Sequence, residues 1–399
     1  MTSPLLVVAG EASGDQAAAA VVAALRLSGP LRAIGMGGAA MVAAGVSLVC
    51  DLRESTAMGL GAVAGRAGSI AASAARVLRA AREEDVHAAL LVNYTEFNAR
   101  LAPALHDRGI HVVWYGAPQI WAWRSGRAAG LRPHVDRMAL MLPFEEPLWR
   151  QHGVDAHYVG HPAREVAGLS RSEARTALGL DAHARAVAVL PGSRPHEVRA
   201  LLEPMLRAIE RLRRERGPID ARVLLAPSLD RAARERARAR AAKHGVSTFE
   251  VGASQGAGLV LPAFDVALTA SGTAALEATL ARAVPVVAYR VGLVTEIVAR
   301  ALLRTPHIAL PNVLLGRRAF PELLQRDVTP ASLAAAVAQS LDRRAELLAA
   351  CAEVEVALGE RRTPSREVAT MLLPWIAAPM TPLPGWRAPQ SRMPGRRAP

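Results

Sequence analysis

The chain has 399 residues, 51% of them hydrophobic, so it is long enough for two domains and too apolar to be disordered as a whole. Its net charge of +13 favours anionic partners, but an aromatic content of 4% argues against stacking on single-stranded nucleic acid, and we expect no nucleic-acid partner. The two cysteines are far apart, no apolar run reaches ~18 residues, and the start of the sequence has no basic segment. We therefore expect no disulfide framework, no membrane-spanning helix and no signal peptide, which fits a reducing cytoplasm.

Short apolar runs alternate with helical stretches rich in Ala, Leu and Arg. The predicted strands cover residues 5–9, 88–92, 111–115 and 137–142 in the first part, and 186–190, 221–226, 265–270 and 285–289 in the second. Continuous apolar strands separated by helices are typical of a parallel sheet that helices cover on both faces. The sequence therefore predicts an α/β fold with two doubly wound, Rossmann-like domains.

The domain boundary is predicted near residues 159–168, where a strand pattern ends in Gly-His-Pro. We expect an N-terminal domain over residues 1–163 and a C-terminal domain over residues 164–344. Residues 345–376 carry only helical signal and are expected to pack across the domains. Residues 377–399 are rich in Pro, Gly and Arg, which predicts a disordered tail. Arginine runs such as residues 231–245 are expected to be solvated helix faces.

The turn after the first predicted strand, AGEASGDQ, opens a helix with small residues. Such a turn lets Ser13, Gly14 and nearby backbone N–H groups approach a ligand, although it is neither a GxGxxG nor a Walker loop. The structural alternative is that Ser13 or Asp15 caps the first helical turn. Glu11 has no comparable structural explanation, because it is an acid at the end of a strand.

The first half also contains two apolar loops that are candidate ligand surfaces. AMGLGAVAGRAG (57–68), which includes Met58 and Leu60, lies next to basic residues and suits a membrane surface, with core packing as the alternative. YGAPQIWAWR (115–124) places Trp121 and Trp123 in a loop after a strand, where they either stack on a sugar or pack between loops.

The predicted strand 88–92 runs into Asn93, and a carboxylate follows at Glu96. Ligands of open α/β sheets bind at the carboxyl ends of strands, so both residues are candidates for a catalytic site. An amide cannot accept a proton at neutral pH, which favours Glu96 over Asn93 as a general base. Glu11 and Asp15 are further candidates for this role.

In the second half, LPGSRPHEV (190–198) repeats the pattern of a strand, a glycine turn and a helix. A positive helix end together with Arg194 suits a diphosphate, and Gly192 and Ser193 precede it in the turn. The alternative is a structural pair between Arg194 and either Glu197 or Glu203.

TASGTAALEATL (269–280) is a third strand end that feeds a helix. Ser271, Gly272 and Thr273 offer hydroxyls and unhindered N–H groups at the helix start, and Glu277 is placed to accept hydrogen bonds from ribose hydroxyls. The alternative is an ordinary helix cap with a surface acid. The two cysteines are in no CxxC spacing, so we expect no metal and no other cofactor.

A set of motifs, in family order from residue 9 to about residue 325, resembles the lipid-A-disaccharide synthase family of GT-B-fold glycosyltransferases. The motifs are AGEASGD, IGMGGAAMVAAGV, AMGL, YGAPQIWAWR, LPFE, VGHP, LPGSRPHE, ASGTAALE, LPN and PELLQ. The resemblance implies an inverting transfer from UDP-2,3-diacylglucosamine to 2,3-diacylglucosamine 1-phosphate (lipid X), without a metal or other cofactor. It also implies a peripheral location on the cytoplasmic face of the anionic inner membrane.

The resemblance assigns the two substrates to different domains. The UDP-sugar residues that it implies are Gly192, Ser193, Arg194, Glu197, Ser271, Gly272, Thr273, Glu277, Asn312, Glu322 and Gln325. The acceptor and lipid side would comprise Glu11, Ser13, Gly14, Asp15, Met58, Leu60, Trp121 and Trp123. The expected catalytic residues are Glu96, Asn93 and Arg194.

One departure from the family pattern affects the catalytic residues. The acceptor strand of the family usually ends Asp-x-x-Asp-Phe-Asn, whereas residues 93–98 read NYTEFN, with Asn93 at the position of the usual base. Two alternatives stay open. One is another UDP-sugar enzyme of this fold, such as an epimerase or a cell-wall glycosyltransferase. The other, which Asn93 motivates, is a relative that binds UDP-sugar or lipid without turnover. The sequence does not distinguish a monomer from a homodimer.

Overall fold

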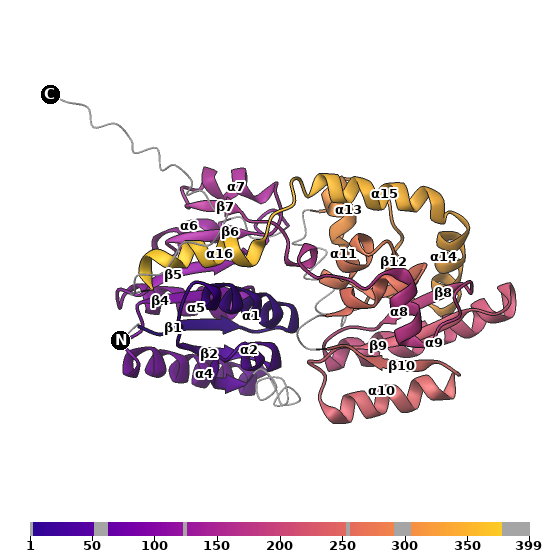
Figure 1. Ribbon diagram of the computed structural model, residues 1–399, viewed down its shortest axis with the longest axis horizontal. Coiled ribbons are helices and arrows are strands. Elements are labelled where there is room, and N and C mark those ends of the chain that lie inside the picture. Colours follow the sequence, from indigo (N-terminus) through magenta and orange to yellow (C-terminus); the bar gives the residue numbers. More distant parts are fainter. Residues whose placement is uncertain (1–2, 52–62, 123–125, 253–255, 291–304, 377–399) are drawn as a thin grey trace.

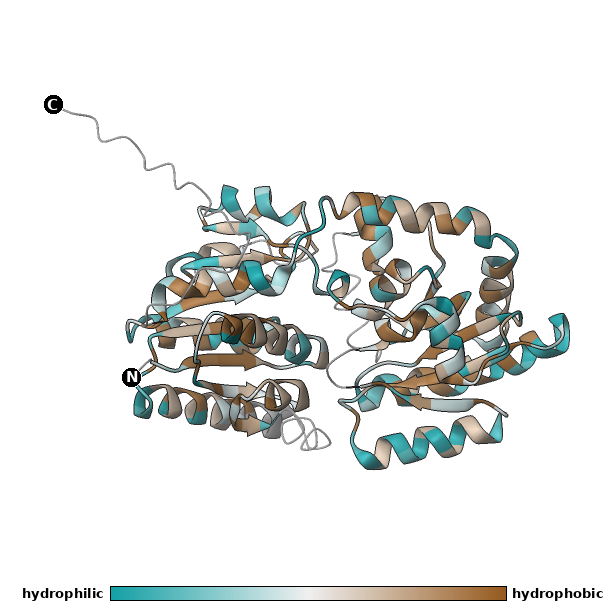
Figure 2. Cartoon of the chain, in the orientation of Figure 1, coloured by the Kyte–Doolittle hydropathy of each residue, from teal (hydrophilic) through white to brown (hydrophobic). Residues whose placement is uncertain are grey.

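A computed structural model describes residues 3–51, 63–122, 126–252, 256–290 and 305–376. It contains two parallel β-sheets side by side, each covered by helices on both faces (Figure 1). The strands are the hydrophobic interior, whereas α10 (Arg231–Lys243) presents a hydrophilic surface (Figure 2). The predicted α/β fold with two doubly wound domains is confirmed.

The first sheet has seven strands in the order β3-β2-β1-β4-β5-β6-β7. The strands are β1 (Leu5–Ala9), β2 (Ala33–Gly37), β3 (Ser47–Asp51), β4 (Ala88–Val92), β5 (His111–Tyr115), β6 (Arg137–Leu140) and β7 (Ala156–Tyr158). The helices are α1 (Ala12–Leu27), α2 (Ala39–Ala43), α4 (Val63–Glu83), α5 (Thr95–His106), α6 (Arg127–Leu131) and α7 (Glu145–Gln151). The order reverses at β1 and β4, so the open edge between their carboxyl ends is where a ligand is expected.

The second sheet has six strands in the order β10-β9-β8-β11-β12-β13. The strands are β8 (Ala186–Leu190), β9 (Asp220–Leu225), β10 (Ser247–Glu250), β11 (Val266–Ala270), β12 (Val284–Tyr289) and β13 (Glu322–Leu324). The helices are α8 (Arg171–Leu178), α9 (Pro195–Arg216), α10, α11 (Thr273–Leu280), α13 (Leu310–Leu315), α14 (Pro330–Asp342) and α15 (Arg344–Ala357). The reversal between β8 and β11 gives this sheet a switch point of the same kind.

The chain crosses between the two sheets twice. It leaves the first sheet after β7, and α16 (Pro364–Leu372) returns to pack on α1 (Figure 1). The two crossings are bonded to each other, because the Tyr158 hydroxyl donates to the Leu358 carbonyl at 2.5 Å and Ser365 Oγ donates to Glu165 at 2.7 Å. Residues 377–399 lie outside the described residues.

Each of the eight predicted strands coincides with an observed strand to within two residues at either end. The prediction missed β2, β3, β10 and β13, and it noted β7 only as the strand pattern that ends in Gly-His-Pro. β10 and β13 are short, with four and three residues. β2 carries two glycines, and β3 and β10 are edge strands that are partly exposed. The arginine run 231–245 forms α10, which buries only Ala233, Ala237 and Ala241, so it is a solvated helix face.

Candidate functional site

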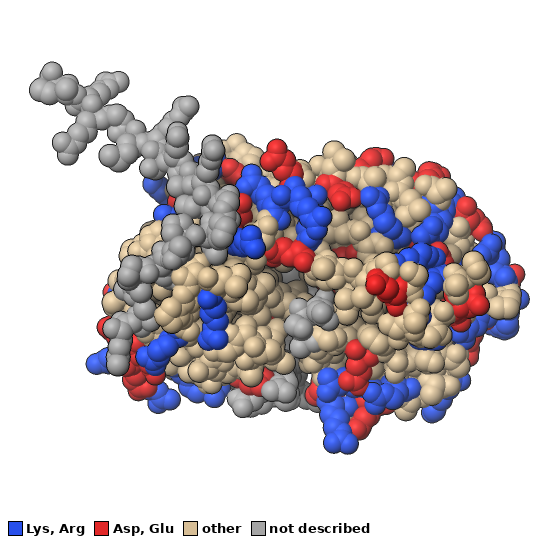
Figure 3. Space-filling view, viewed as in Figure 1, with Lys and Arg blue, Asp and Glu red and all other residues tan. Residues whose placement is uncertain are grey.

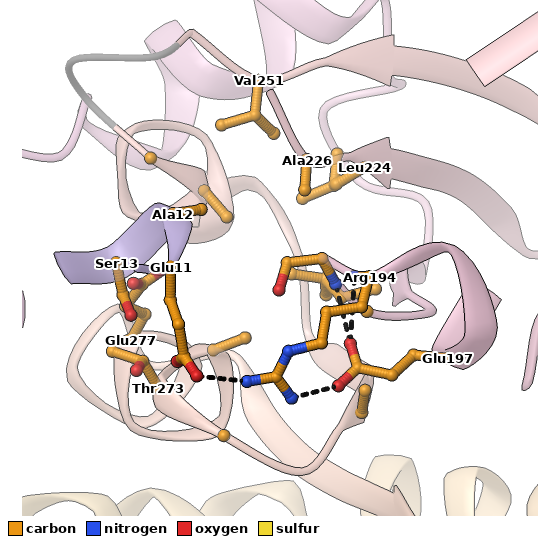
Figure 4. A pocket seen from close by; sticks show the side chains of 18 of the residues that line it. Glu11, Ala12, Ser13, Arg194, Glu197, Leu224, Ala226, Val251, Thr273 and Glu277 are labelled. Carbon is orange, nitrogen blue, oxygen red and sulfur yellow. Dashed lines mark hydrogen bonds and ion pairs between the residues drawn. The ribbon is translucent and has the colours of Figure 1, made fainter. Parts of the chain in front are cut away.

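The carboxyl ends of β1, β8, β9 and β11 meet in one cleft between the two domains. It holds about 920 Å³ of empty space that opens to solvent (Figure 4). The lining comprises Glu11, Ala12, Ser13, Gln16, Leu190, Gly192, Ser193, Arg194, Glu197, Leu224, Ala226, Pro227, Val251, Gly256, Ala257, Ala270, Ser271, Gly272, Thr273, Ala274 and Glu277. Both domains therefore contribute to the same site.

Three helices begin at this cleft: α1, α9 and α11. In the described residues no side chain caps α1 or α11, whose N-cap residues are Glu11 and Gly272. The first backbone N–H groups of a helix lack partners inside the helix, and the helix dipole places partial positive charge there. The cleft is therefore built to receive an anion such as a diphosphate.

The turn before α9 is closed over the carboxylate of Glu197. This carboxylate accepts hydrogen bonds from the backbone N–H groups of Ser193 and Arg194, at 3.0 and 3.2 Å. Gly192 has a φ of +119°, and a Cβ added to it would lie 2.4 Å from Glu197 Oε2. A side chain at position 192 would therefore break the turn that presents Arg194 to the cleft.

Arg194 joins the two domains across the cleft. Its Nη1 donates to Glu197 Oε1 at 3.0 Å, and its Nη2 donates to Glu11 Oε1 at 2.5 Å (Figure 4). Burial lowers the pKa of Arg194, but the charges of Glu11 and Glu197 outweigh it, so the pKa is raised and the side chain stays cationic. The pair with Glu11 is 46% and 39% exposed, so it contributes at most about 1 kcal/mol and an incoming anion can replace it.

Glu277 is the acid on the α11 side of the cleft. Burial raises its pKa to about 7, and among the described residues its carboxylate has no hydrogen-bond partner. Ser271, Gly272 and Thr273 line the cleft at the start of the same helix. The structure thus brings together the residues that the sequence singled out in 190–198 and 269–280.

Asp15 does not face the cleft. It is 6% exposed, and its carboxylate accepts hydrogen bonds from the backbone N–H groups of Gly38, Ala40 and Met41 at 2.7 to 3.2 Å. Asp15 thus holds the start of α2 and not of its own helix, and the structural alternative, a cap on α1 by Ser13 or Asp15, is wrong. With both oxygens occupied, Asp15 is a structural residue and not a candidate base.

The end of β4 carries Asn93 and Tyr94 in left-handed backbone conformations, with φ of 49° and 41°. Asn93 is held by its own N–H, which donates to the Tyr115 carbonyl, and by Asn98 Nδ2, which donates to the Asn93 carbonyl. Glu96 instead forms an ion pair with Arg127 at 2.6 Å and is 59% exposed. Glu96 is not among the residues that line the cleft, whereas Glu11 is.

Three residues expected at the UDP-sugar site lie elsewhere. Asn312 is fully buried, and its Nδ2 donates to Glu322 Oε1 at 2.7 Å. Glu322 also accepts from the backbone N–H groups of Ile308 and Ala309, both at 3.1 Å. These bonds hold residues 308–312 against β13. Gln325, in a left-handed conformation after β13, is also absent from the cleft lining.

Trp121 packs between loops, which was the alternative to stacking on a sugar. Its Nε1 donates to the buried carboxylate of Glu145 at 3.0 Å, and its ring lies edge-on to Phe144 with centroids 5.4 Å apart. Three further residues that were predicted for the lipid side lie outside the described residues: Met58, Leu60 and Trp123. Within the described ranges no group of three or more His, Cys, Asp or Glu could hold a metal ion.

Sequence reasoning missed the apolar wall of the cleft and Gln16. Leu224 lies in β9, Ala226 follows β9, and Val251 follows β10. They face the cleft opposite the carboxylates of Glu11 and Glu277 (Figure 4). Because ligands bind at the carboxyl ends of parallel strands, the predicted strand β9 could have indicated Leu224 and Ala226. The same rule could not indicate Val251, because β10 was not among the predicted strands.

Comparison with known proteins gives one family. A family model described as Lipid-A-disaccharide synthetase matches residues 5–370. A lipid-A-disaccharide synthase of Myxococcus xanthus is 43% identical over 380 residues, which is 93% of this chain and 98% of that protein.

Solved structures share the fold at low sequence identity. The UDP-GlcNAc 2-epimerase from Neisseria meningitidis bound to UDP-GlcNAc has a TM-score of 0.65 at 11% identity, covering 93% of this chain and 100% of that one. MurG from Acinetobacter baumannii has a TM-score of 0.53 at 13% identity, covering 93% and 99%. At such identities the likeness concerns the GT-B fold alone.

Proposed function

The chain belongs to the lipid-A-disaccharide synthetase family, and from this premise we propose that it joins UDP-2,3-diacylglucosamine to 2,3-diacylglucosamine 1-phosphate (lipid X). Its activity is that of a glycosyltransferase in lipid A disaccharide synthesis. The products are the lipid A disaccharide 1-phosphate and UDP. Among fold relatives, epimerases act on UDP-sugars too, so the family, and not the fold, separates the two activities.

One observation carries the donor half of this proposal: Arg194 lies where three helix starts converge. The diphosphate of the donor would bind the guanidinium and the N–H groups at the starts of α1 and α11. The uracil ring would lie against the apolar wall of Leu224 and Val251, and Glu277 would face the ribose hydroxyls. When the bond to the sugar breaks, negative charge grows on the diphosphate, and these fixed positive groups stabilise it.

The acceptor would approach from the first domain, at the end of β4. An acceptor hydroxyl attacks the anomeric carbon of the donor, the bond from that carbon to the diphosphate oxygen breaks, and UDP takes the electron pair. A carboxylate must accept the hydroxyl proton, because the amide of Asn93 cannot. In this scheme Asn93 positions the hydroxyl, and the reaction inverts the anomeric centre.

We also propose that the protein works on the cytoplasmic face of the anionic inner membrane, as a monomer or a homodimer. No helix in the described ranges is long and apolar enough to cross a membrane. The net charge of +13 supports attraction to anionic lipid, and the apolar sequence 57–65 supplies a segment for contact. On the face drawn in Figure 3, basic side chains are interspersed with acidic ones.

Product analysis tests the proposed reaction. Purified protein given both acylated substrates should release UDP and form the disaccharide, as followed by mass spectrometry. UDP-N-acetylglucosamine offered alone should stay unchanged. Conversion of that sugar to its epimer, with no disaccharide from the acylated pair, would favour the epimerase alternative.

A further inference from the structure

Glu11 occupies a special place among the acids of the cleft. Its carboxylate is 39% exposed, lines the cleft, and has one ion-pair partner in the described part of the chain, Arg194. Glu197, the other partner of Arg194, keeps its bonds to two backbone N–H groups whether or not the guanidinium is present. Removing Arg194 from this cluster would therefore free Glu11 and leave Glu197 held.

Glu11 also borders the end of β4. The ring of Tyr94 packs on Gly10, where an added Cβ would lie 2.0 Å from Tyr94 Cγ. The side-chain amide of Asn93 lies beside Gly14, 3.6 Å from the position of an added Cβ. The turn that carries Glu11 is thus in contact with the strand end that would position the acceptor hydroxyl, and Glu11 itself is bonded to Arg194.

We propose that Glu11 is the general base of the transfer and that Arg194 stays ion-paired to its carboxylate until the donor diphosphate binds. This inference rests on the proposed function. The diphosphate draws the guanidinium away, and the carboxylate of Glu11 is then free. It accepts the proton of the acceptor hydroxyl as the oxygen bonds to the anomeric carbon and UDP leaves with the electron pair. The proton on Glu11 then passes to water.

The other acids of the site are less suited to this role. Asp15 has both oxygens bonded to the backbone of α2. Glu277 lies on α11 in the second domain, among the residues that face the donor. Glu96 is engaged by Arg127 and does not line the cleft. Among the described acids that line the cleft, Glu11 alone belongs to the first domain, and it pairs with Arg194, which the donor diphosphate would also bind.

The arrangement sets an order of events. Without donor, the base is neutralised by Arg194, so an acceptor that binds first finds no proton acceptor. With donor bound, the same cation stabilises the leaving group and the base is exposed. The ion pair therefore couples binding of the donor in the second domain to proton transfer by Glu11 of the first domain.

The test compares Glu11→Gln with wild type in two measurements. Turnover should fall by about 10²–10⁴-fold, the usual contribution of a general base. UDP affinity, measured by calorimetry, should rise by about two- to fivefold, because the carboxylate that competes for Arg194 is gone. A residue that only held the domains together would lose UDP affinity along with turnover.

Glu84→Gln is the matched control. Glu84 lies on the same domain, is also 39% exposed, and pairs with Arg32 at 2.6 Å away from the cleft. Its substitution should change neither turnover nor UDP affinity. If Glu84→Gln lowers turnover as much as Glu11→Gln does, loss of any surface ion pair on this domain is sufficient, and the proposal is overturned.

Chemical rescue separates proton transfer from positioning. Formate added to Glu11→Ala should restore part of the turnover by acting as a carboxylate in the vacated space. Normal turnover of Glu11→Gln, or a larger loss in Glu96→Gln than in Glu11→Gln, would overturn the proposal. If wild type forms no disaccharide, the proposed function fails, and the UDP affinity of Glu11→Gln still decides whether Glu11 competes with the diphosphate.

Discussion

Arg194 and Glu197 are bonded to each other at the start of α9, with Nη1 and Oε1 3.0 Å apart. The sequence left open whether this pair is structural or whether Arg194 serves a ligand. One oxygen of Glu197 closes the turn, and the other holds the guanidinium of Arg194 in the cleft. A structural partner thus positions the arginine that we propose binds the donor diphosphate.

Replacing Arg194 by alanine should lower turnover by roughly a hundredfold or more, the scale seen when one donor to a transition state is removed. Lysine should restore only part of it, because an ammonium lacks the two-pronged guanidinium geometry. Arg207→Ala is the control, since Arg207 lies on the same helix in an exposed pair with Glu203. The rate of steady-state UDP release is measured for all three variants. A near-normal rate for Arg194→Ala would mean that the arginine is purely structural.

Replacing Asn312 by alanine should lower the free energy of unfolding by about 2–4 kcal/mol. The amide is hydrogen-bonded to Phe320 and Glu322, and its loss removes one donor from the buried Glu322 carboxylate and leaves the backbone groups of Phe320 without their partner. Urea denaturation measures the change, and the folded variant should bind UDP normally. A stable variant with weak UDP binding would instead place Asn312 at the ligand, as the sequence suggested.

Glu145 should make stability depend on pH. Burial raises its pKa from about 4.5 to about 7, although the bond from Trp121 opposes this. Between pH 4.5 and pH 7, the carboxyl group of Glu145 keeps its proton in the folded state and has released it in the unfolded state. Stability from this group is therefore highest below pH 4.5 and falls as pH rises to 7, by about 3 kcal/mol at most. Glu145→Gln should flatten this part of the profile in urea titrations at pH 5 and pH 8.

Anionic vesicles should bind the protein, and salt should weaken the binding. Each basic residue near the surface adds ~1 kcal/mol of attraction, which is screened as ionic strength rises. Replacing Met58 and Leu60 by aspartate should reduce flotation with vesicles and leave UDP affinity unchanged. Association that ignores both salt and this double change would contradict the proposed membrane contact.

The sequence predicted the parallel strands because each is a continuous apolar run, and it predicted the cleft because glycine turns follow three of them. The uses of individual polar residues were harder to predict. Asp15 bonds to residues 23 to 26 positions away and Glu322 to Asn312 and Ala309, so both read as site residues until the fold showed their partners. The pair of Glu11 and Arg194 spans 183 positions, and no local pattern reveals it.

The most direct test of the account is the amount of UDP and of disaccharide formed by one preparation of wild-type protein, with and without the acceptor. If the cleft transfers an acylated sugar to a hydroxyl, UDP release requires both substrates and one disaccharide forms for each UDP. If UDP binds but neither product forms, the chain binds its substrates without turnover. If UDP is released equally well from the donor alone, the reaction is hydrolysis, and the account of acceptor activation is wrong.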